Sequence, residues 1–254
     1  MKFGISNISI IPIRFDPSDK AEMINQILFG EHFKILETRK KWSKIRLSHD
    51  NYEGWICNKQ FVNIPEEDYF QLNKDTPTIT TDILDIVTKT EHQPIVIGSI
   101  LPKYKSGHAI INNEMYKFDG LTTTGFINKE KISENALLYL NAPYLWGGRS
   151  PLGIDCSGLT QMVYRLQGTK LPRDAHQQAE VGTTLSFIEE SESGDLAFFD
   201  DKEGKIIHVG IILENNHIIH SSGKVRIDRI DQQGIFNQEK GHHTHKLRLI
   251  KSIV

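Results

Sequence analysis

A glycine-rich stretch, Tyr144–Leu159 (YLWGGRSPLGIDCSGL), decides both the fold and the chemistry predicted for this chain. It contains Cys156, at the start of an amphipathic helix predicted over residues 157–167 (SGLTQMVYRLQ) and stopped by Gly168. Free N–H groups and the dipole at a helix N-terminus stabilise a thiolate, so we expect a lowered pKa for this thiol. The nearby glycines permit close approach of a ligand to the backbone. The pattern therefore favours a nucleophile over a buried structural cysteine, the commoner fate of a lone cysteine.

Two histidines further along the chain could act as the base that a thiol nucleophile needs. His208 lies in a predicted strand over 206–213 (IIHVGIIL), and His220 ends the next predicted strand, 217–220 (HIIH). The Glu-Asn-Asn between them is typical of a hairpin turn, which would bring both rings to one face of a sheet. We therefore favour a functional pair over two solvated imidazoles.

The chain changes character near residue 130. Helices predicted over 131–140 and 157–167 are followed by strands over 195–199, 206–213, 217–220 and 246–250. Helices first and an antiparallel meander afterwards is an α+β order.

Short strands dominate the first half. Residues 1–65 and 75–128 each show several strands at close spacing, which predicts two small β-barrel modules, with a polar break at Pro65–Asp68. One helix is expected in the first module, over Asp19–Phe29, with Asp19 as N-cap and Gly30 ending it.

Composition excludes several classes of protein. The 254 residues carry 30 Lys+Arg and 32 Asp+Glu, a net charge of −2, which argues against a basic nucleic-acid-binding surface. No run approaches the roughly 18 apolar residues of a membrane helix. Two cysteines do not make a disulfide scaffold, and Cys57, in a predicted strand, is expected to be inert. The apolar N-terminal stretch is too interrupted for a signal peptide, so we expect a cytoplasmic protein unless a leader has been removed.

Five segments, in this order, resemble the NlpC/P60 family of cysteine peptidases: PYLWGGRSPLGIDCSGLTQMVY (143–164), PRDAHQQ (172–178), GDLAFF (194–199), HVGIIL (208–213) and IIHSSG (218–223). The resemblance implies a papain-like catalytic domain over residues 129–254. It implies that Cys156 is the nucleophile, His208 the base and His220 the third residue, which orients the base. It also implies that Tyr144 helps to stabilise the oxyanion.

The same resemblance implies a substrate site. Asp155 and Ser157 match positions that line it, as does Asp174, after which Ala175 stands where a serine is often found. The two β modules resemble the bacterial SH3-like domains of YkfC-type γ-D-glutamyl-L-diamino acid endopeptidases. In those enzymes the first module reads the free amine of an N-terminal L-Ala. AEMINQILFGE (21–31) and NYEGW (51–55) place Glu22 and Tyr52 at the matching positions.

We therefore expect a cytoplasmic cysteine endopeptidase that acts on murein tripeptides or tetrapeptides during peptidoglycan recycling. The third substrate residue stays open between diaminopimelate and L-Lys. The resemblance implies no cofactor, no metal, and neither nucleic acid nor a membrane as partner. Two alternatives remain: a cell-wall-peptide binding module whose NlpC/P60 domain is catalytically silent, or an acyltransferase or amidase on the same fold.

One further motif invites a metal. The run His242-His243-Thr244-His245 contains three histidines, but no fourth ligand stands at a recognisable spacing. We therefore favour a loop leading into the last strand over a zinc site.

Overall fold

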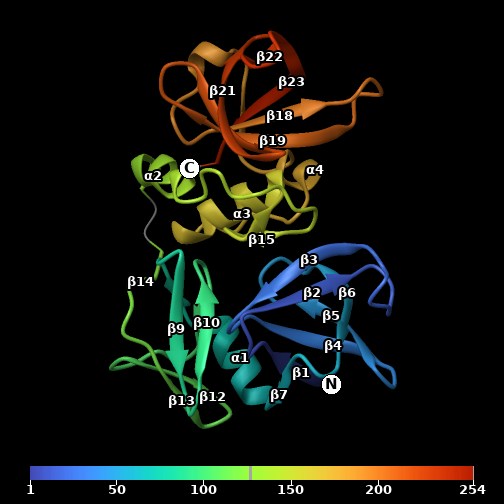
Figure 1. Cartoon of the computed structure of the whole chain (residues 1–254), viewed down its shortest axis with the longest axis vertical. Coiled ribbons are helices and arrows are strands. Elements are labelled where there is room, and N and C mark those ends of the chain that lie inside the picture. The colour runs from blue at the N-terminus through green and yellow to red at the C-terminus, as the bar shows by residue number, and fades with distance from the viewer. Residues whose placement is uncertain (126–127, 254) are drawn as a thin grey trace. The chain divides into compact units, whose positions relative to one another are not determined.

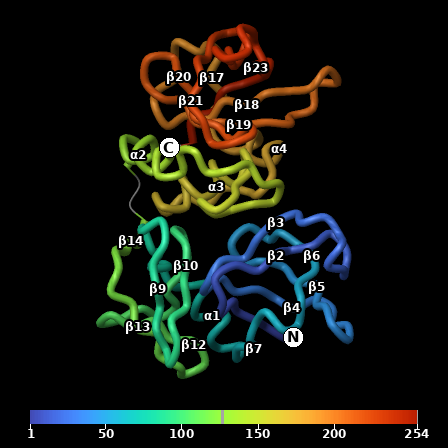
Figure 2. Tube along the Cα trace, in the orientation of Figure 1, coloured from blue at the N-terminus to red at the C-terminus, as the bar shows by residue number. Residues whose placement is uncertain are grey.

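The computed structural model describes residues 1–125 and 128–253, and the chain forms two compact units, residues 1–125 and 126–254 (Figure 1). Figure 2 follows the chain from the strand-rich first unit to the helices and strands of the second. Each unit has its own strands and its own buried apolar residues, and each is described separately below.

The first seven strands of unit 1 form one antiparallel sheet in the order β3-β2-β6-β5-β4-β1-β7. Six of its isoleucines form a buried cluster with Phe33 and Leu47. The strands are β1 (Lys2–Ile5), β2 (Ile10–Arg14), β3 (Met23–Leu28), β4 (His32–Thr38), β5 (Trp42–Leu47), β6 (Glu53–Cys57) and β7 (Val62–Ile64).

The expected helix over Asp19–Phe29 is wrong, because this segment contains strand β3. Ile11 of β2 pairs with Ile27 of β3. Isoleucine is β-branched, so it loses side-chain freedom in a helix and packs well on a pleated sheet. Pairing with β2 thus overrides the helical spacing of the apolar residues.

The polar break at Pro65–Asp68 is in fact the start of a helix, α1 (Glu66–Lys74), with Pro65 as its N-cap. Its first turn carries three acidic residues, which the positive end of the helix dipole stabilises.

The rest of unit 1 is built from short strands in two small sheets, ordered β10-β9-β13-β12 and β11-β8-β14. These strands are β8 (Thr78–Thr80), β9 (Leu84–Thr88), β10 (His92–Val96), β11 (Ile100–Leu101), β12 (His108–Ile111), β13 (Glu114–Lys117) and β14 (Thr122–Thr123). One buried cluster combines Phe3, Phe29 and Tyr69 with Val87, Ile111 and others, so both halves of unit 1 share a core. The division into modules 1–65 and 75–128 stays a prediction.

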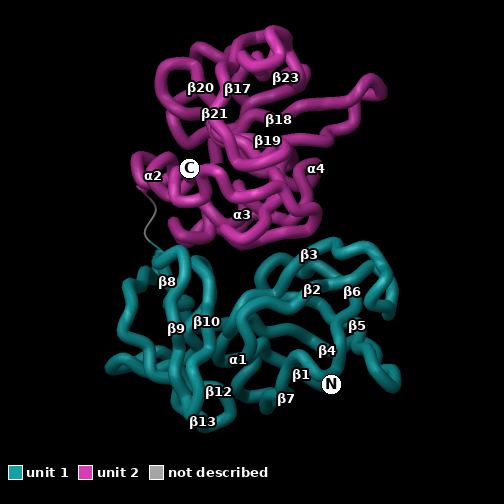
Figure 3. Tube along the Cα trace, viewed as in Figure 1, with its two compact units in different colours: residues 1–125 teal, residues 126–254 magenta. Residues whose placement is uncertain are grey.

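Unit 2 begins with helices α2 (Lys129–Leu137), α3 (Cys156–Leu166) and α4 (Ala175–Gln178), and the two-stranded β15 (Arg149–Ser150) and β16 (Gly153–Ile154) lie between α2 and α3. A sheet follows in the order β17-β23-β18-β19-β20-β21-β22, and β22 also pairs with β23, which closes six strands into a barrel. Figure 3 shows this unit in magenta. Its strands are β17 (Thr183–Leu185), β18 (Leu196–Asp200), β19 (Ile206–Leu213), β20 (His217–Ser222), β21 (Lys224–Asp231), β22 (Gly234–Asn237) and β23 (His242–Ser252). All three helices pack against β19, the strand that carries His208.

The helices and strands predicted for this half are present, and the hairpin between β19 and β20 turns through Asn215 and Asn216, both at a φ of 58°. The loop expected at His242–His245 is wrong, because this run forms the first part of β23 and pairs with β22. None of the helices described is long and apolar enough to span a membrane.

Candidate active site

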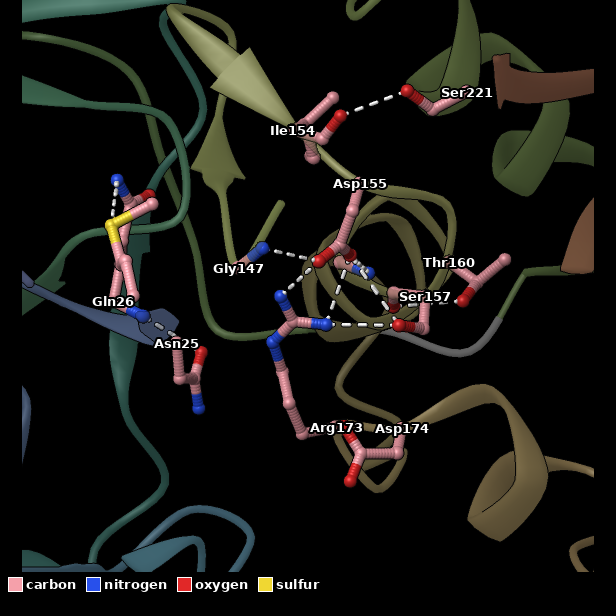
Figure 4. Close-up of polar contacts among 12 residues, drawn as sticks. Asn25, Gln26, Gly147, Ile154, Asp155, Ser157, Thr160, Arg173, Asp174 and Ser221 are labelled. Carbon is pink, nitrogen blue, oxygen red and sulfur yellow. Dashed lines mark hydrogen bonds and ion pairs between the residues drawn. The ribbon is translucent and has the colours of Figure 1, made fainter. Parts of the chain in front are cut away.

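Cys156 opens α3, and the residue before it, Asp155, is the helix N-cap. The Asp155 carboxylate accepts hydrogen bonds from the backbone N–H groups of Gly158, at 2.7 Å, and Gly147, at 2.8 Å (Figure 4). Arg173 adds two further bonds to the same carboxylate, at 2.9 and 2.6 Å, and both side chains are buried. This paired carboxylate joins the glycine-rich loop, the start of α3 and the segment before α4.

The glycines let these segments come together. A Cβ added to Gly158 would lie 2.3 Å from the carbonyl oxygen of Gly148, which no side chain tolerates. Gly147 has a φ of 76°, in the left-handed region that favours glycine. The sequence WGG and CSG therefore builds the tight turn that sets Cys156 at the helix start.

The thiol of Cys156 is buried, and burial raises its pKa to about 12, with the Asp155 charge adding to the rise. Backbone N–H groups of Val209 and Ser157 and the charge of Arg173 act in the opposite direction on this pKa but do not outweigh burial. The expectation of a lowered thiol pKa is therefore wrong for the free protein. The resting form is a neutral thiol whose sulfur accepts a hydrogen bond from the residue after His208.

The two histidines meet as the hairpin predicts. Nε2 of His208 lies 2.8 Å from Nδ1 of His220, and both side chains are buried. Gly210, two residues after His208, pairs directly with His220. A side chain at Gly210 would lie 2.9 Å from Cβ of His220, so glycine leaves the space that the second ring occupies.

A carboxylate continues this chain of contacts. Nε2 of His220 lies 3.0 Å from Oδ2 of Asp228, which also receives bonds from Arg226 at 2.7 and 2.9 Å. Burial raises the pKa of Asp228, but the bonds from His220 and Arg226 outweigh burial and leave that pKa below its usual value. Asp228 is therefore an ionised acceptor.

With both imidazoles neutral, this geometry sets their tautomers. Because a carboxylate only accepts, His220 donates its Nε2–H to Asp228 and keeps a lone pair on Nδ1. His208 then donates its own Nε2–H to His220, which leaves the lone pair on Nδ1 of His208. Burial, together with His220 and His245, holds the pKa of His208 well below its usual value, so the ring is neutral at rest.

Two family models match this chain. Residues 141–243 match the model of the NlpC/P60 family, and residues 13–61 match the bacterial dipeptidyl-peptidase SH3 domain. The chain contains an NlpC/P60 domain and a bacterial SH3 domain.

The relatives of these two domains are peptidases. This chain is 28% identical to "Dipeptidyl-peptidase 6" of Lysinibacillus sphaericus, over 86% of this chain and 88% of that protein. It is 24% identical to "Gamma-D-glutamyl-L-lysine dipeptidyl-peptidase" of Bacillus cereus, over 77% of this chain and 66% of that protein. A solved NlpC/P60 family protein from Bacillus cereus superposes with a TM-score of 0.84 at 17% identity, covering 99% of both chains. The chain is therefore a hydrolase of the peptidase class.

Within the NlpC/P60 domain, Tyr144 lies next to the cysteine loop. Its backbone N–H donates a hydrogen bond to the carbonyl of Gly223, and its backbone pairs in parallel with that of Ile154. Burial raises the pKa of the Tyr144 hydroxyl to about 12, with further contributions from Cys156 and Asp155. The hydroxyl is therefore a protonated hydrogen-bond donor at neutral pH.

Ser157 and Asp174, the other residues that the resemblance places at the substrate, both adjoin Arg173, one through a hydrogen bond and the other as the next residue in the chain. The Ser157 hydroxyl accepts a bond from Arg173 at 2.9 Å. Asp174 is the N-cap of α4 and is half-buried. Glu22 and Tyr52 belong to unit 1, where Glu22 is exposed just before β3 and Tyr52 packs partly against the isoleucine core. Their role at the site stays a prediction.

The sequence analysis gives no role to three residues of unit 2 that contribute to the site. Arg173 lies in the PRDAHQQ segment, and its pairing with the buried Asp155 carboxylate depends on the tertiary structure. Asp228 was absent from the prediction, although it follows His220 on the next strand and lies diagonally across from it. His245 stacks on His208 with ring centroids 4.3 Å apart, and only the closure of the barrel brings the two together.

Proposed function

We propose that this chain is a cysteine endopeptidase that hydrolyses the γ-D-glutamyl-L-diamino acid bond of cell-wall muropeptides with a free N-terminal L-Ala. The observation that carries the proposal is the line of hydrogen bonds from Asp228 through His220 to His208, beside a cysteine at a helix start. A relative that is 24% identical over 77% of this chain carries the name gamma-D-glutamyl-L-lysine dipeptidyl-peptidase. The bond cleaved and the free amine are inferences from that likeness.

The nucleophile starts as a neutral thiol. As Sγ of Cys156 attacks the γ-glutamyl carbonyl carbon, its proton passes to Nδ1 of His208, and a C–S bond forms. The tetrahedral intermediate then collapses, His208 gives the proton to the leaving amine, and the C–N bond breaks. Water attacks the resulting thioester with His208 again taking the proton, and the thiol is restored when the C–S bond breaks.

Asp228 acts through His220 in this scheme. When His208 gains a proton, its Nε2–H bond to His220 becomes charge-assisted, and Asp228 holds His220 in the tautomer that accepts it. Arg226 fixes the carboxylate from the other side.

The developing oxyanion needs donors. The backbone N–H of Cys156 and the hydroxyl of Tyr144 supply two, and the raised pKa of Tyr144 keeps its hydroxyl protonated. Losing one such donor typically lowers a rate by about 10²–10³-fold.

Recognition of the substrate amine is assigned to Glu22, Tyr52 and Asp174. A free ammonium ion is strongly hydrated, so a site that selects it must offer carboxylates in return. Asp155 contributes less to this recognition than its position suggests, because Arg173 already neutralises its charge. Arg173 bonds to both Asp155 and Ser157 and so fixes the backbone around Cys156. In this proposal Asp155 and Ser157 line the substrate site as part of that fixed loop.

We also propose that the catalytic part is a papain-like α+β domain over 129–254 and that residues 75–128 form a second SH3-like module. Helices α2 and α3 before the antiparallel strands support the first inference, and the two small sheets of β8–β14 support the second. Cytoplasmic recycling of wall peptides is the setting that fits a substrate with a free amine.

The test is a pair of defined tripeptides, L-Ala-γ-D-Glu-L-Lys and the same peptide acetylated at its amine, each also made with meso-diaminopimelate. We expect release of the free diamino acid from the free-amine peptides and a large loss of rate with the acetylated ones. Equal rates on both forms would contradict amine recognition and favour an enzyme that acts on intact wall.

A further inference from the structure

We propose that His208, His220 and His245 form a binding site for a divalent cation of borderline softness, such as Zn²⁺, that reversibly blocks the catalytic histidines. One ring nitrogen from each histidine lies within 4.8 Å of those of the other two. The site itself stands on this geometry, and the consequence for activity rests on the function proposed above.

His245 brings the third ligand from a different strand. The first part of β23 pairs with β22, which closes the barrel. This pairing places the ring of His245 against the rings of His208 and His220. The ring of His245 stacks on His208 and meets His220 edge to face, with centroids 4.3 and 5.5 Å away. Three imidazoles from three strands are the donor type that Zn²⁺ and Co²⁺ prefer.

Two of the three rings are already oriented by a second partner, as ligating histidines in metal sites usually are. His220 directs its Nε2–H to Asp228, which leaves Nδ1 for a ligand. His245 holds Nδ1 2.9 Å from the Thr244 hydroxyl, whose own proton points to the carbonyl of Ile235, so Nε2 of His245 is left for a ligand.

A metal would displace the bond between His208 and His220. With metal–nitrogen distances of about 2.0–2.1 Å, tetrahedral coordination sets the nitrogens about 3.4 Å apart. His208 and His220 would separate slightly from 2.8 Å, and the ring of His245 would turn out of its stack to approach. His208 would then ligate through Nε2 and carry its proton on Nδ1, so it could no longer accept the proton of Cys156.

A pocket reaches one of the three proposed ligands. A pocket of about 460 Å³ is lined by Gln232, Gln233 and the run 243–247, which includes His245. The two catalytic histidines are buried, whereas His245 is half-buried. An ion that enters from this pocket would therefore meet His245 first.

The test uses Cys156→Ala protein, which separates metal binding from peptidase activity and removes the thiolate as a ligand. We expect one Co²⁺ per chain, with the visible bands of tetrahedral nitrogen coordination and no sulfur charge-transfer band. Adding His245→Gln should weaken Co²⁺ and Zn²⁺ binding by about tenfold or more, the usual effect of disturbing a metal site. His242→Gln, an exposed histidine of the same run, is the matched control and should bind as its parent does.

Inhibition is measured separately in protein with Cys156 intact. Each variant is normalised to its own rate in the presence of chelator, and half-inhibition by Zn²⁺ should need about tenfold more metal in His245→Gln. Thermal unfolding of His245→Gln, and His245→Asn as a second variant, show whether the fold is kept. The proposal is overturned if Co²⁺ does not bind Cys156→Ala, if folded His245 variants bind as tightly as their parent, or if His242→Gln weakens binding equally.

Discussion

Nε2 of His208 lies 2.8 Å from Nδ1 of His220, so one imidazole holds the other in a defined tautomer inside the barrel. The arrangement depends on Asp228, which fixes the proton of His220 from the far side.

Replacing the carboxylate should slow turnover without weakening substrate binding. In Asp228→Asn, the amide can donate to His220 and favour the wrong tautomer, so we expect kcat to fall by about 10- to 1,000-fold with KM nearly unchanged. Asp231→Asn is the matched control, because Asp231 lies on the same strand but pairs with His243 at the surface. A kcat for Asp228→Asn equal to that of Asp231→Asn would show that Asp228 does not position His220 for catalysis.

The raised pKa of Cys156 predicts how the free protein reacts with an alkylating reagent. In a Cys57→Ser background, the alkylation rate should rise about tenfold for each pH unit between pH 6 and 9, because the thiolate fraction grows in that way below a pKa of about 12. The measurement is the rate of iodoacetamide labelling against pH, followed by mass. A rate already on a plateau at neutral pH would mean that the resting protein holds a thiolate and an imidazolium.

The pair of Arg173 and Asp155 should matter for stability. Both side chains are buried, so Arg173→Gln leaves a carboxylate without its charge partner, and we expect a loss of about 3–5 kcal/mol in the free energy of unfolding. Lys131→Gln removes an exposed ion pair with Glu134 and should change the free energy by about 0.5 kcal/mol or less. Denaturant unfolding of both variants decides this, and equal small effects would show that the buried pair does not stabilise the loop.

Glu22 tests whether unit 1 reads the substrate. A charge-assisted hydrogen bond to an ammonium is worth about 1.5–3 kcal/mol, so Glu22→Ala should lower kcat/KM on a free-amine tripeptide by about tenfold to a few hundredfold. The loss should shrink with an acetylated peptide, which no longer offers the partner. Glu67→Ala, an exposed carboxylate of α1, is the control. Identical behaviour of the two variants would leave the histidine pair in place and remove Glu22 from recognition.

Local sequence patterns predicted much of unit 2. Strand β19 covers the predicted residues, and the Asn-Asn turn brings His208 to His220, because alternation and turn chemistry are properties of neighbouring residues. The helix prediction for the segment of β3 is wrong because its apolar residues fit a helix and a strand almost equally. Pairing with β2 decides between the two. Asp228 lies near the histidine pair because of the register between β20 and β21, and His245 lies there because β22 pairs with β23. Neither pairing can be predicted from a short stretch of sequence.

The thiol pKa also depends on tertiary structure. The helix N-terminus at Cys156 is visible in the sequence, but the backbone N–H groups that lower the pKa of this thiol do not outweigh its burial and the charge of Asp155. The sequence predicts where the nucleophile lies, whereas only the packed structure gives its protonation state.

The central claim is that Cys156 hydrolyses the γ-D-glutamyl bond of a small wall peptide. The most direct measurement is mass-spectrometric detection of products from L-Ala-γ-D-Glu-L-Lys and its meso-diaminopimelate form, with wild-type protein, Cys156→Ala and Cys57→Ser. The account predicts L-Ala-γ-D-Glu and free diamino acid from wild type and Cys57→Ser, and none from folded Cys156→Ala. Products from Cys156→Ala at the wild-type rate, or an intact peptide after incubation with wild type, would contradict it.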